Sequence, residues 1–324
     1  MRVILSRRAA LAATGLLAAP APLRAQGFPS RPIRVMVGFA PGGAADTIAR
    51  LIAPGMGAAL GQTVVVENRS GASGTNAAAV VATAPADGHT ILLSTLTHVS
   101  NPFLFSGLPF DYATAFAPVS QVVLFPTVLA VRKDFPAADM AGFLALARSR
   151  RDTPITYGTP GNATAQHMAA ELLQQRADIK LEHVPYRGGA DAARDLAAGV
   201  IEASFNSVSS LAPAFAAGAR PLVAVTAQRI PQLPDVPTGI EAGIPDFVLS
   251  DICGVYAPAQ TPPDTVATLY RAIAAALRAD EVQARLRALA AQGVGSSPAE
   301  FTAFMQQEST RLGALIRAAG ISVS

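Results

Sequence analysis

The sequence contains little cysteine, histidine and charge, and it has no tryptophan. Cys253 is the single cysteine among 324 residues, so an intrachain disulfide is excluded and the fold must rely on its hydrophobic core. Its neighbours are Ile252 and Gly254, which favours a small buried side chain at this position. Charged residues make up 15% of the chain and apolar residues 51%. This composition is typical of a packed globular protein, and the length is sufficient for two domains.

The first 25 residues have the layout of an export signal. Arg7 and Arg8 precede an apolar run at residues 9–19, and small residues and prolines follow it. The run is shorter than the ~20 residues that span a bilayer, and no later segment offers such a run. A Sec and a twin-arginine signal both fit, with cleavage expected after Ala25 rather than Ala21. We therefore expect the mature protein in the periplasm.

Removal of this leader changes the charge of the protein. The chain has 25 Lys and Arg against 22 Asp and Glu. The leader holds four of the arginines and no acid, which leaves 21 basic residues, 22 acidic residues and a net charge of −1. A nucleic-acid-binding protein would normally carry a basic stripe, and the sequence contains none. The charge pattern therefore gives no support to a nucleic-acid partner.

Strand-like and helix-like segments alternate twice along the chain. The first alternation covers residues 32–95, and its first helix is expected to break near Pro54. The second covers residues 121–227. Alternation of this kind predicts parallel sheets covered by helices. A proline-rich segment at 233–247 is expected to be an irregular loop, and helices are predicted after Thr261, at 281–291 and at 298–318.

The two alternations predict an α/β protein with two lobes, each a central sheet flanked by helices. We expect residues 26–123 and 251–324 to form lobe 1 and residues 124–250 to form lobe 2. The chain would then cross between the lobes twice, and the two crossing strands would act as a hinge. Ligands of such folds bind outside the carboxyl ends of strands, so the cleft between the lobes is the expected site.

Three turns that follow predicted strands are candidates for that site. They cover residues 40–46, 94–98 and 159–164, and the first and third lead into helices. The first N–H groups of a helix have no internal partner, and the helix dipole adds positive potential there. Glycine also lets a ligand approach the backbone closely. Two such helix starts facing each other could hold a carboxylate without lysine or arginine.

Other kinds of site fit the sequence less well. The first turn lacks the Lys-Ser/Thr pair of a phosphate loop and the G-x-G-x-x-G pattern of a dinucleotide site. The four histidines do not stand near a nucleophile elbow, and the spacing of His167 and Glu171 suits a metal but is more often structural. Asp46 has two interpretations, a helix N-cap, which we favour, or a contact to a ligand ammonium group.

Five ordered motifs resemble the extracytoplasmic substrate-binding proteins of tripartite tricarboxylate transporters, the Bug family. The motifs read "FPSRPIRVMVGFAPGGAADTIAR", "VVVENRSGASGTNAAAVVATAPADGHTILL", "YGTPGNATAQHMAAELL", "HVPYRGGADAARDLAAGVIEASF" and "RPLVAVTAQRIPQLPDVPTGIEAG", and the resemblance extends from about Phe28 to the C-terminus. Ala45, Ala163 and Ile252 depart from the family pattern, which often has a hydroxyl or glycine, a glycine and a tryptophan at these places.

The resemblance implies a fold, a function and a set of ligand-binding residues. The fold is that of a type II-like periplasmic binding protein, expected to be a monomer with no catalytic residues, metal or cofactor. The function is to bind a small organic carboxylate between the lobes and deliver it to the membrane subunits of the transporter. Signalling to a membrane sensor kinase is the alternative. The ligand-binding residues carried over are Phe39, Pro41, Gly42, Gly43, Ala44, Asp46, Ser94, Thr95, Thr97, Thr159, Gly161, Asn162, Thr164 and Asn206.

Overall fold

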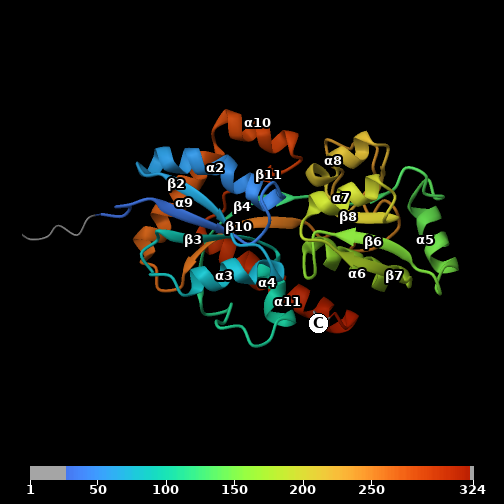
Figure 1. The fold of residues 1–324 in the computed structure, drawn as a ribbon, viewed down its shortest axis with the longest axis horizontal. Helices are drawn as coiled ribbons and strands as arrows, with labels where there is room; N and C mark the ends of the chain where they lie inside the picture. Colours follow the sequence, from blue (N-terminus) through green and yellow to red (C-terminus); the bar gives the residue numbers. More distant parts are fainter. Residues whose placement is uncertain (1–26, 322–324) are drawn as a thin grey trace, which may run out of the picture.

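The computed structural model describes residues 27–321 and contains two sheets that lie side by side (Figure 1). The predicted export signal lies outside the described residues. The first sheet has six strands in the order β11-β4-β10-β3-β1-β2, and the second has five in the order β7-β6-β8-β5-β9. Helices flank both sheets, which confirms the predicted two-lobed α/β architecture. Within residues 27–321, the structure has no helix long and apolar enough to cross a membrane.

Lobe 1 is built around the six-stranded sheet. Its strands are β1 (Ile33–Val37), β2 (Val64–Asn68), β3 (Thr90–Thr95), β4 (Phe116–Phe125), β10 (Asp251–Pro258) and β11 (Gln292–Gly293). Its helices are α2 (Ala44–Leu60), the 3-10 turn η1 (Ala72–Gly74), α3 (Thr75–Ala82), α4 (Thr97–Leu104), α9 (Pro263–Leu277), α10 (Asp280–Ala288) and α11 (Pro298–Ala319).

Lobe 2 is built around the five-stranded sheet. Its strands are β5 (Thr127–Val131), β6 (Ile155–Thr159), β7 (Leu181–Pro185), β8 (Ala203–Ser207) and β9 (Arg220–Ala224). Its helices are α5 (Met140–Ser149), α6 (Ala165–Ala177), α7 (Gly189–Ala197) and α8 (Val208–Ala216).

The sheets are mixed, whereas alternation in the sequence predicted parallel ones. In lobe 1, β1 runs parallel to β2 and β3, but β10 runs antiparallel to both β3 and β4. In lobe 2, β6 is parallel to β7 and β8, but β5 is antiparallel to β8 and β9. The two reversed strands are β5 and β10, and each directly follows a crossing between the sheets. Strand direction reverses there because the chain arrives from the other lobe.

Side-chain alternation along the strands explains how each sheet is covered on both faces. In β5, Val128 and Ala130 pack in the same cluster as side chains of α7 and α8, while Leu129 and Val131 pack with side chains of α5 and α6. Such period-two alternation puts successive side chains on opposite faces. In lobe 1, Figure 1 shows α2 and α9 on one side of the sheet and α3 and α11 on the other.

Helix α2 corrects a prediction from the sequence. Pro54 was expected to break this helix, yet α2 runs on to Leu60 and ends at Gly61, whose φ is +65°. Ile52 and Met56 are buried on either side of Pro54, and Gly55 lies so close to α9 that an added Cβ would meet Ala276 at 2.8 Å. Tertiary packing on both sides of the proline keeps the helix continuous at a local cost in hydrogen bonding.

The chain crosses between the sheets at two places. At the first, Pro126 alone separates β4 from β5. At the second, residues 225–250 connect β9 to β10, and this described stretch holds no helix or strand beyond a single bridge from Ala224 to Thr238. It contains the segment that the sequence predicted to be irregular. The crossings are therefore of different kinds, one a strand interrupted by a proline and the other a long loop.

Cys253 lies in β10 and is fully buried in lobe 1. Burial raises the pKa of its thiol well above 9, so the thiol stays protonated and acts as an apolar side chain. This confirms the role predicted from its neighbours in the sequence.

Candidate ligand-binding site

A cavity of about 240 Å³, called here the inner cavity, lies between the lobes. Lobe 1 lines it with the β1–α2 turn, with Thr95 at the end of β3 and with Asp251 at the start of β10. Lobe 2 lines it with the first turns of α6 and α7, with Asn206 and Ser207 at the end of β8, and with Ser210. The cavity thus lies where the sequence predicted it, outside the carboxyl ends of β1, β3, β6 and β8.

Four helix N-termini converge on the inner cavity. Helix α2 contributes its start from lobe 1, and α6, α7 and α8 contribute theirs from lobe 2. The caps are Gly43, Thr164, Gly188 and Ser207, and the hydroxyls of Thr164 and Ser207 accept hydrogen bonds from the N–H groups of His167 and Ser210. Each helix start carries a fraction of a positive charge. The arrangement is therefore suited to an anion.

Only two of these helix starts, those of α2 and α6, were predicted from the sequence. The starts of α7 and α8 were missed as parts of the site. The signals were present, because Gly188 precedes α7 and Gly189 opens it, and Ser207 follows the predicted Asn206. What the sequence could not show is that α7 and α8 begin side by side. Asn206 joins them by donating a hydrogen bond from Nδ2 to the Gly189 carbonyl at 2.9 Å and accepting one from the Ser207 N–H at 2.9 Å.

A second cavity of about 560 Å³, the outer cavity, adjoins the first. The two share Phe39, Pro160 and Thr164 among their lining residues. The loop of residues 70–73 lines the outer cavity on one side, and Gly161, Asn162 and Arg187 line it on the other. The two cavities are therefore neighbours with part of their walls in common.

The predicted site residues fall into three groups. The inner cavity is lined by Phe39, Pro41, Gly43, Ala44, Thr95, Thr164 and Asn206. The outer cavity adds Gly161 and Asn162. Five predicted residues line neither cavity, and these are Gly42, Asp46, Ser94, Thr97 and Thr159.

Four of these five residues are buried, and three of the four, Ser94, Thr97 and Thr159, contact the strands and loops around the cavities. Ser94 pairs with Gly254 in the β3–β10 ladder. The hydroxyl of Thr97 lies 3.2 Å from that of Thr95, which lines the inner cavity. The hydroxyl of Thr159 contacts His183 Nε2 at 2.7 Å and donates to the Gly161 carbonyl at 3.0 Å. Each of these three side chains contacts a neighbouring residue and lines neither cavity. Their sequence positions did not distinguish them from residues that line a cavity.

Asp46 is not the N-cap that we favoured. Helix α2 begins at Ala44 with Gly43 as its cap, so Asp46 lies in the first turn. Its buried carboxylate accepts hydrogen bonds from Gly42 N–H at 2.9 Å, Arg50 Nε at 3.0 Å and Asn68 Nδ2 at 2.8 Å. Burial alone would raise the pKa of Asp46, but these three donors outweigh it and hold the pKa below the ordinary 3.8. Asp46 therefore stabilises the turn that contains Gly42 and Gly43 without lining either cavity.

We expect Asp46→Asn to destabilise the protein by about 2 kcal/mol at pH 7, because a neutral amide offers one acceptor to three donors. The folded-state pKa of Asp46 is depressed, so its stabilisation is present above the unfolded-state pKa and is lost as the pH falls through the folded-state value. Urea unfolding at pH 7 and pH 3 is the measurement. The difference in the free energy of unfolding between wild type and variant should be smaller at pH 3 than at pH 7. An equal difference at both pH values would contradict this explanation.

Direct hydrogen bonds join the lobes around the cavities. Ser73 Oγ of lobe 1 donates to the Asn162 carbonyl of lobe 2 at 2.7 Å, and Ser100 Oγ donates to the Ala163 carbonyl at 2.6 Å. Ala163 has a φ of +62°, which explains why glycine is common at this position in the resembled family. The loop before α6 therefore has two functions, since it lines the cavities and contacts the opposite lobe.

Two of the four histidines, His167 and His183, lie next to each other. The rings of His167 and His183 stack with centroids 4.0 Å apart behind the loop before α6, and Glu171 lies 3.6 Å from His167 Nε2. Burial, and then the neighbouring His167, lower the pKa of His183 to about 3. Among the described residues, no group of three or more His, Cys, Asp or Glu side chains could hold a metal ion.

Two lobes of mixed α/β structure with a cavity between them are the architecture of the periplasmic binding proteins. The chain belongs to one family of this class, since a family model described as "Tripartite tricarboxylate transporter family receptor" matches residues 48–321. This confirms the resemblance found in the five motifs.

Two relatives and two solved structures illustrate the similarity. A UPF0065 protein of the tcbD-tcbE intergenic region of Pseudomonas sp. (strain P51) is 38% identical, covering 96% of this chain and 94% of the relative. BugT of Bordetella pertussis is 31% identical, covering 93% of each. Rhodopseudomonas palustris Rpa4515 with adipate has a TM-score of 0.85 at 34% identity, over 91% of this chain and 100% of that chain. MatC of the same species, with bound malate, has a TM-score of 0.83 at 33% identity, over 89% and 100%.

Proposed function

We propose that this protein captures a small organic carboxylate between its lobes and delivers it to the membrane subunits of a tripartite tricarboxylate transporter. The observation that carries the proposal is the convergence of four helix N-termini on the inner cavity. Among the described residues, no lysine or arginine lines this cavity, so backbone N–H groups, hydroxyls and side-chain amides are the donors available to an anion. The structures of MatC with malate and Rpa4515 with adipate support a carboxylate ligand.

Closure of the lobes supplies the mechanism. We propose lobe 1 as residues 26–123 and 251–324 and lobe 2 as residues 124–250, with the two crossings as the hinge. A ligand held by α2 from one lobe and by α6, α7 and α8 from the other makes all of its contacts only when the lobes are closed. Such differential affinity shifts the population toward the closed state. The closed, loaded protein is then the form offered to the transporter, in the periplasm and as a monomer.

Titration calorimetry and thermal shift against mono-, di- and tricarboxylates and amino acids test this proposal. We expect at least one acid to bind with micromolar affinity, or about 8 kcal/mol, and to raise the melting temperature. Small-angle scattering should show a smaller radius of gyration when that acid is added. Folded protein that binds none of these acids would contradict the proposal. Uptake of the bound acid by vesicles carrying the membrane subunits, dependent on added protein, tests delivery.

A further inference from the structure

One acidic residue lies in the wall of the inner cavity at the boundary between the lobes. Asp251 is the first residue of β10 and is 8% exposed. Its Oδ1 accepts hydrogen bonds from Leu96 N–H at 3.2 Å and Ile252 N–H at 2.9 Å, and its Oδ2 accepts one from Gln166 Nε2 at 3.2 Å. A carboxylate oxygen can accept two hydrogen bonds. Oδ2 therefore retains one unused acceptor position.

Gln166 faces Asp251 from the other lobe. It lies in the first turn of α6, lines the inner cavity and is 2% exposed. Because Nε2 donates to Asp251, the orientation of the amide is fixed and Oε1 is its acceptor end. This Oε1 is buried and has no hydrogen-bond partner among the described residues. A buried acceptor without a partner costs about 1–3 kcal/mol, which a donor on a bound ligand would relieve.

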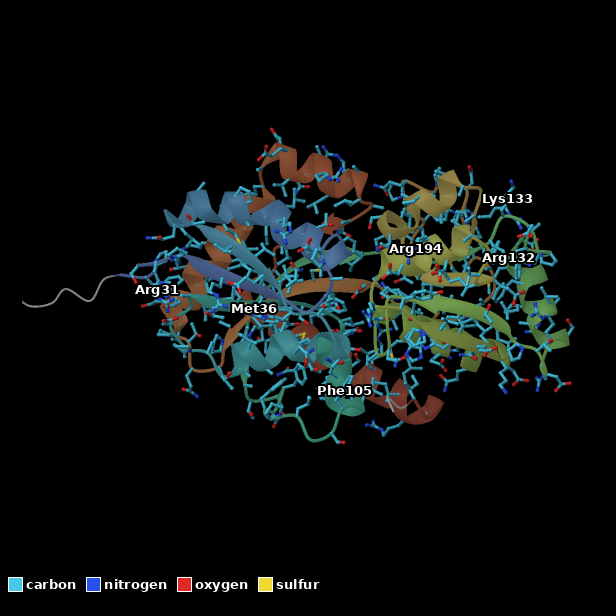
Figure 2. The ribbon with its side chains drawn as sticks, in the orientation of Figure 1. Arg31, Met36, Phe105, Arg132, Lys133 and Arg194 are labelled. Carbon is cyan, nitrogen blue, oxygen red and sulfur yellow. The ribbon has the colours of Figure 1, made fainter. Side chains whose placement is uncertain are left out.

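The charge of the cavity wall favours a donor at this point. The two acids that line the inner cavity are Asp191 and Asp251. Asp191 is paired with Arg194 at 3.0 Å, and Figure 2 shows this arginine on α7 of lobe 2. Asp251 has no cationic partner among the described residues; its contacts are two backbone N–H groups and an amide. Burial raises the pKa of Asp251 above its ordinary value, against the effect of its three hydrogen bonds. In its ionised form Asp251 would repel a second ligand carboxylate beside it, whereas it would accept a hydroxyl or ammonium group.

We propose that Asp251 and Gln166 form a donor subsite, which selects carboxylates bearing a hydroxyl or ammonium group over the unsubstituted acids of the same length. The inference rests on the proposed function, because it concerns the ligand of that same cavity. It assigns to Asp251 the contact with a ligand ammonium group that the sequence analysis considered for Asp46. Asp46 lies outside both cavities with its carboxylate occupied by three donors.

The test is calorimetric titration with three matched series of acids, each differing in one substituent. They are propionate, lactate and alanine; succinate, malate and aspartate; and glutarate, 2-hydroxyglutarate and glutamate. In the series that binds best, we expect the hydroxy or the amino acid to bind at least ~10-fold more tightly than the unsubstituted acid, as one hydrogen bond to a charged group allows. The hydroxy and amino members of each series show which donor the subsite prefers.

Two variants link the preference to these residues. Asp251→Asn replaces the free acceptor with an N–H₂ group, and Gln166→Met removes Oε1 at similar length. Each should bring the ratio of the two affinities close to one. Asp178→Asn is the matched control, since Asp178 is exposed at the C-terminal end of α6 in a left-handed conformation that asparagine tolerates. It should leave the ratio unchanged.

Three outcomes would overturn the inference. The first is an unsubstituted acid that binds wild type as tightly as its substituted partners, and the second is a ratio that survives in folded Asp251→Asn and Gln166→Met. The wild-type series decides the matter even if a variant does not fold. In the third, no acid of any length binds, and the proposed function fails with the inference. The first two leave the proposed function intact, so the two failures are distinguishable.

Discussion

Replacement of Asn206 by aspartate is expected to lower the affinity for a carboxylate ligand roughly 100-fold. Asn206 is 1% exposed, lines the inner cavity and joins the starts of α7 and α8. The substitution preserves shape but places a negative charge close to the bound anion. Two unit charges about 5 Å apart interact by about 3 kcal/mol at an effective dielectric constant near 20, which corresponds to about two orders of magnitude in the dissociation constant.

The measurement for Asn206→Asp is calorimetric titration with the acid that binds wild type best. Gln306→Glu adds the same charge on the exposed face of α11 and serves as the control, with an expected change of less than a factor of two to three in affinity. Thermal unfolding without ligand shows whether the variant is folded. If folded Asn206→Asp bound the acid as tightly as wild type, the carboxylate would not lie beside the starts of α7 and α8.

Replacement of Gly43 by valine is expected to reduce ligand affinity by a similar factor for a steric reason. Gly43 lines the inner cavity and has a φ of −72°, which any residue can adopt. An added Cβ would meet only the Ala40 carbonyl, at 3.3 Å, so the branched side chain would fill open space in the cavity. Loss of about two hydrogen bonds from the first turn of α2 to a charged ligand corresponds to about 3 kcal/mol or more.

The fold should tolerate this change, with a stability cost of about 1 kcal/mol because valine is a poor N-cap. Gly43→Ala provides the graded comparison, since its smaller side chain should weaken binding less. Affinities from calorimetry and unfolding free energies from urea denaturation separate the two effects. Wild-type affinity in Gly43→Val would remove the β1–α2 turn from the ligand contacts.

The sequence predicted the architecture well because its local signals agree with the fold. Apolar strands such as residues 33–37 are followed by glycine turns and amphipathic helices, and tertiary packing seldom opposes these preferences. Pro54 is the exception, where burial of Ile52 and Met56 against the core outweighs the tendency of proline to end a helix. Strand direction in β5 and β10 was not predictable from local pattern, because it depends on how the chain crosses between the lobes.

The site was predicted only in part, for a different reason. Glycine turns and hydroxyl residues after strands located the loops, but the sequence does not show which atoms of a loop face the cavity and which face the core. Asp46 and Thr159 have the same residue types as true lining residues, yet their side chains hold backbone and neighbouring groups. No sequence pattern indicated that Asp251 lines the cavity. Its position there depends on the return of the chain to lobe 1 at the start of β10.

The interlobe contacts of Ser73 and Ser100 have a consequence for divergence among related receptors. Both serines donate to main-chain carbonyls, those of residues 162 and 163. The side chains at 162 and 163 can therefore be exchanged during evolution without loss of these two contacts, provided the backbone keeps its conformation. The Asn162 side chain, which lines the outer cavity, and the two contacts between the lobes therefore depend on different atoms of one loop, so the lining of this cavity can change while the contacts are kept.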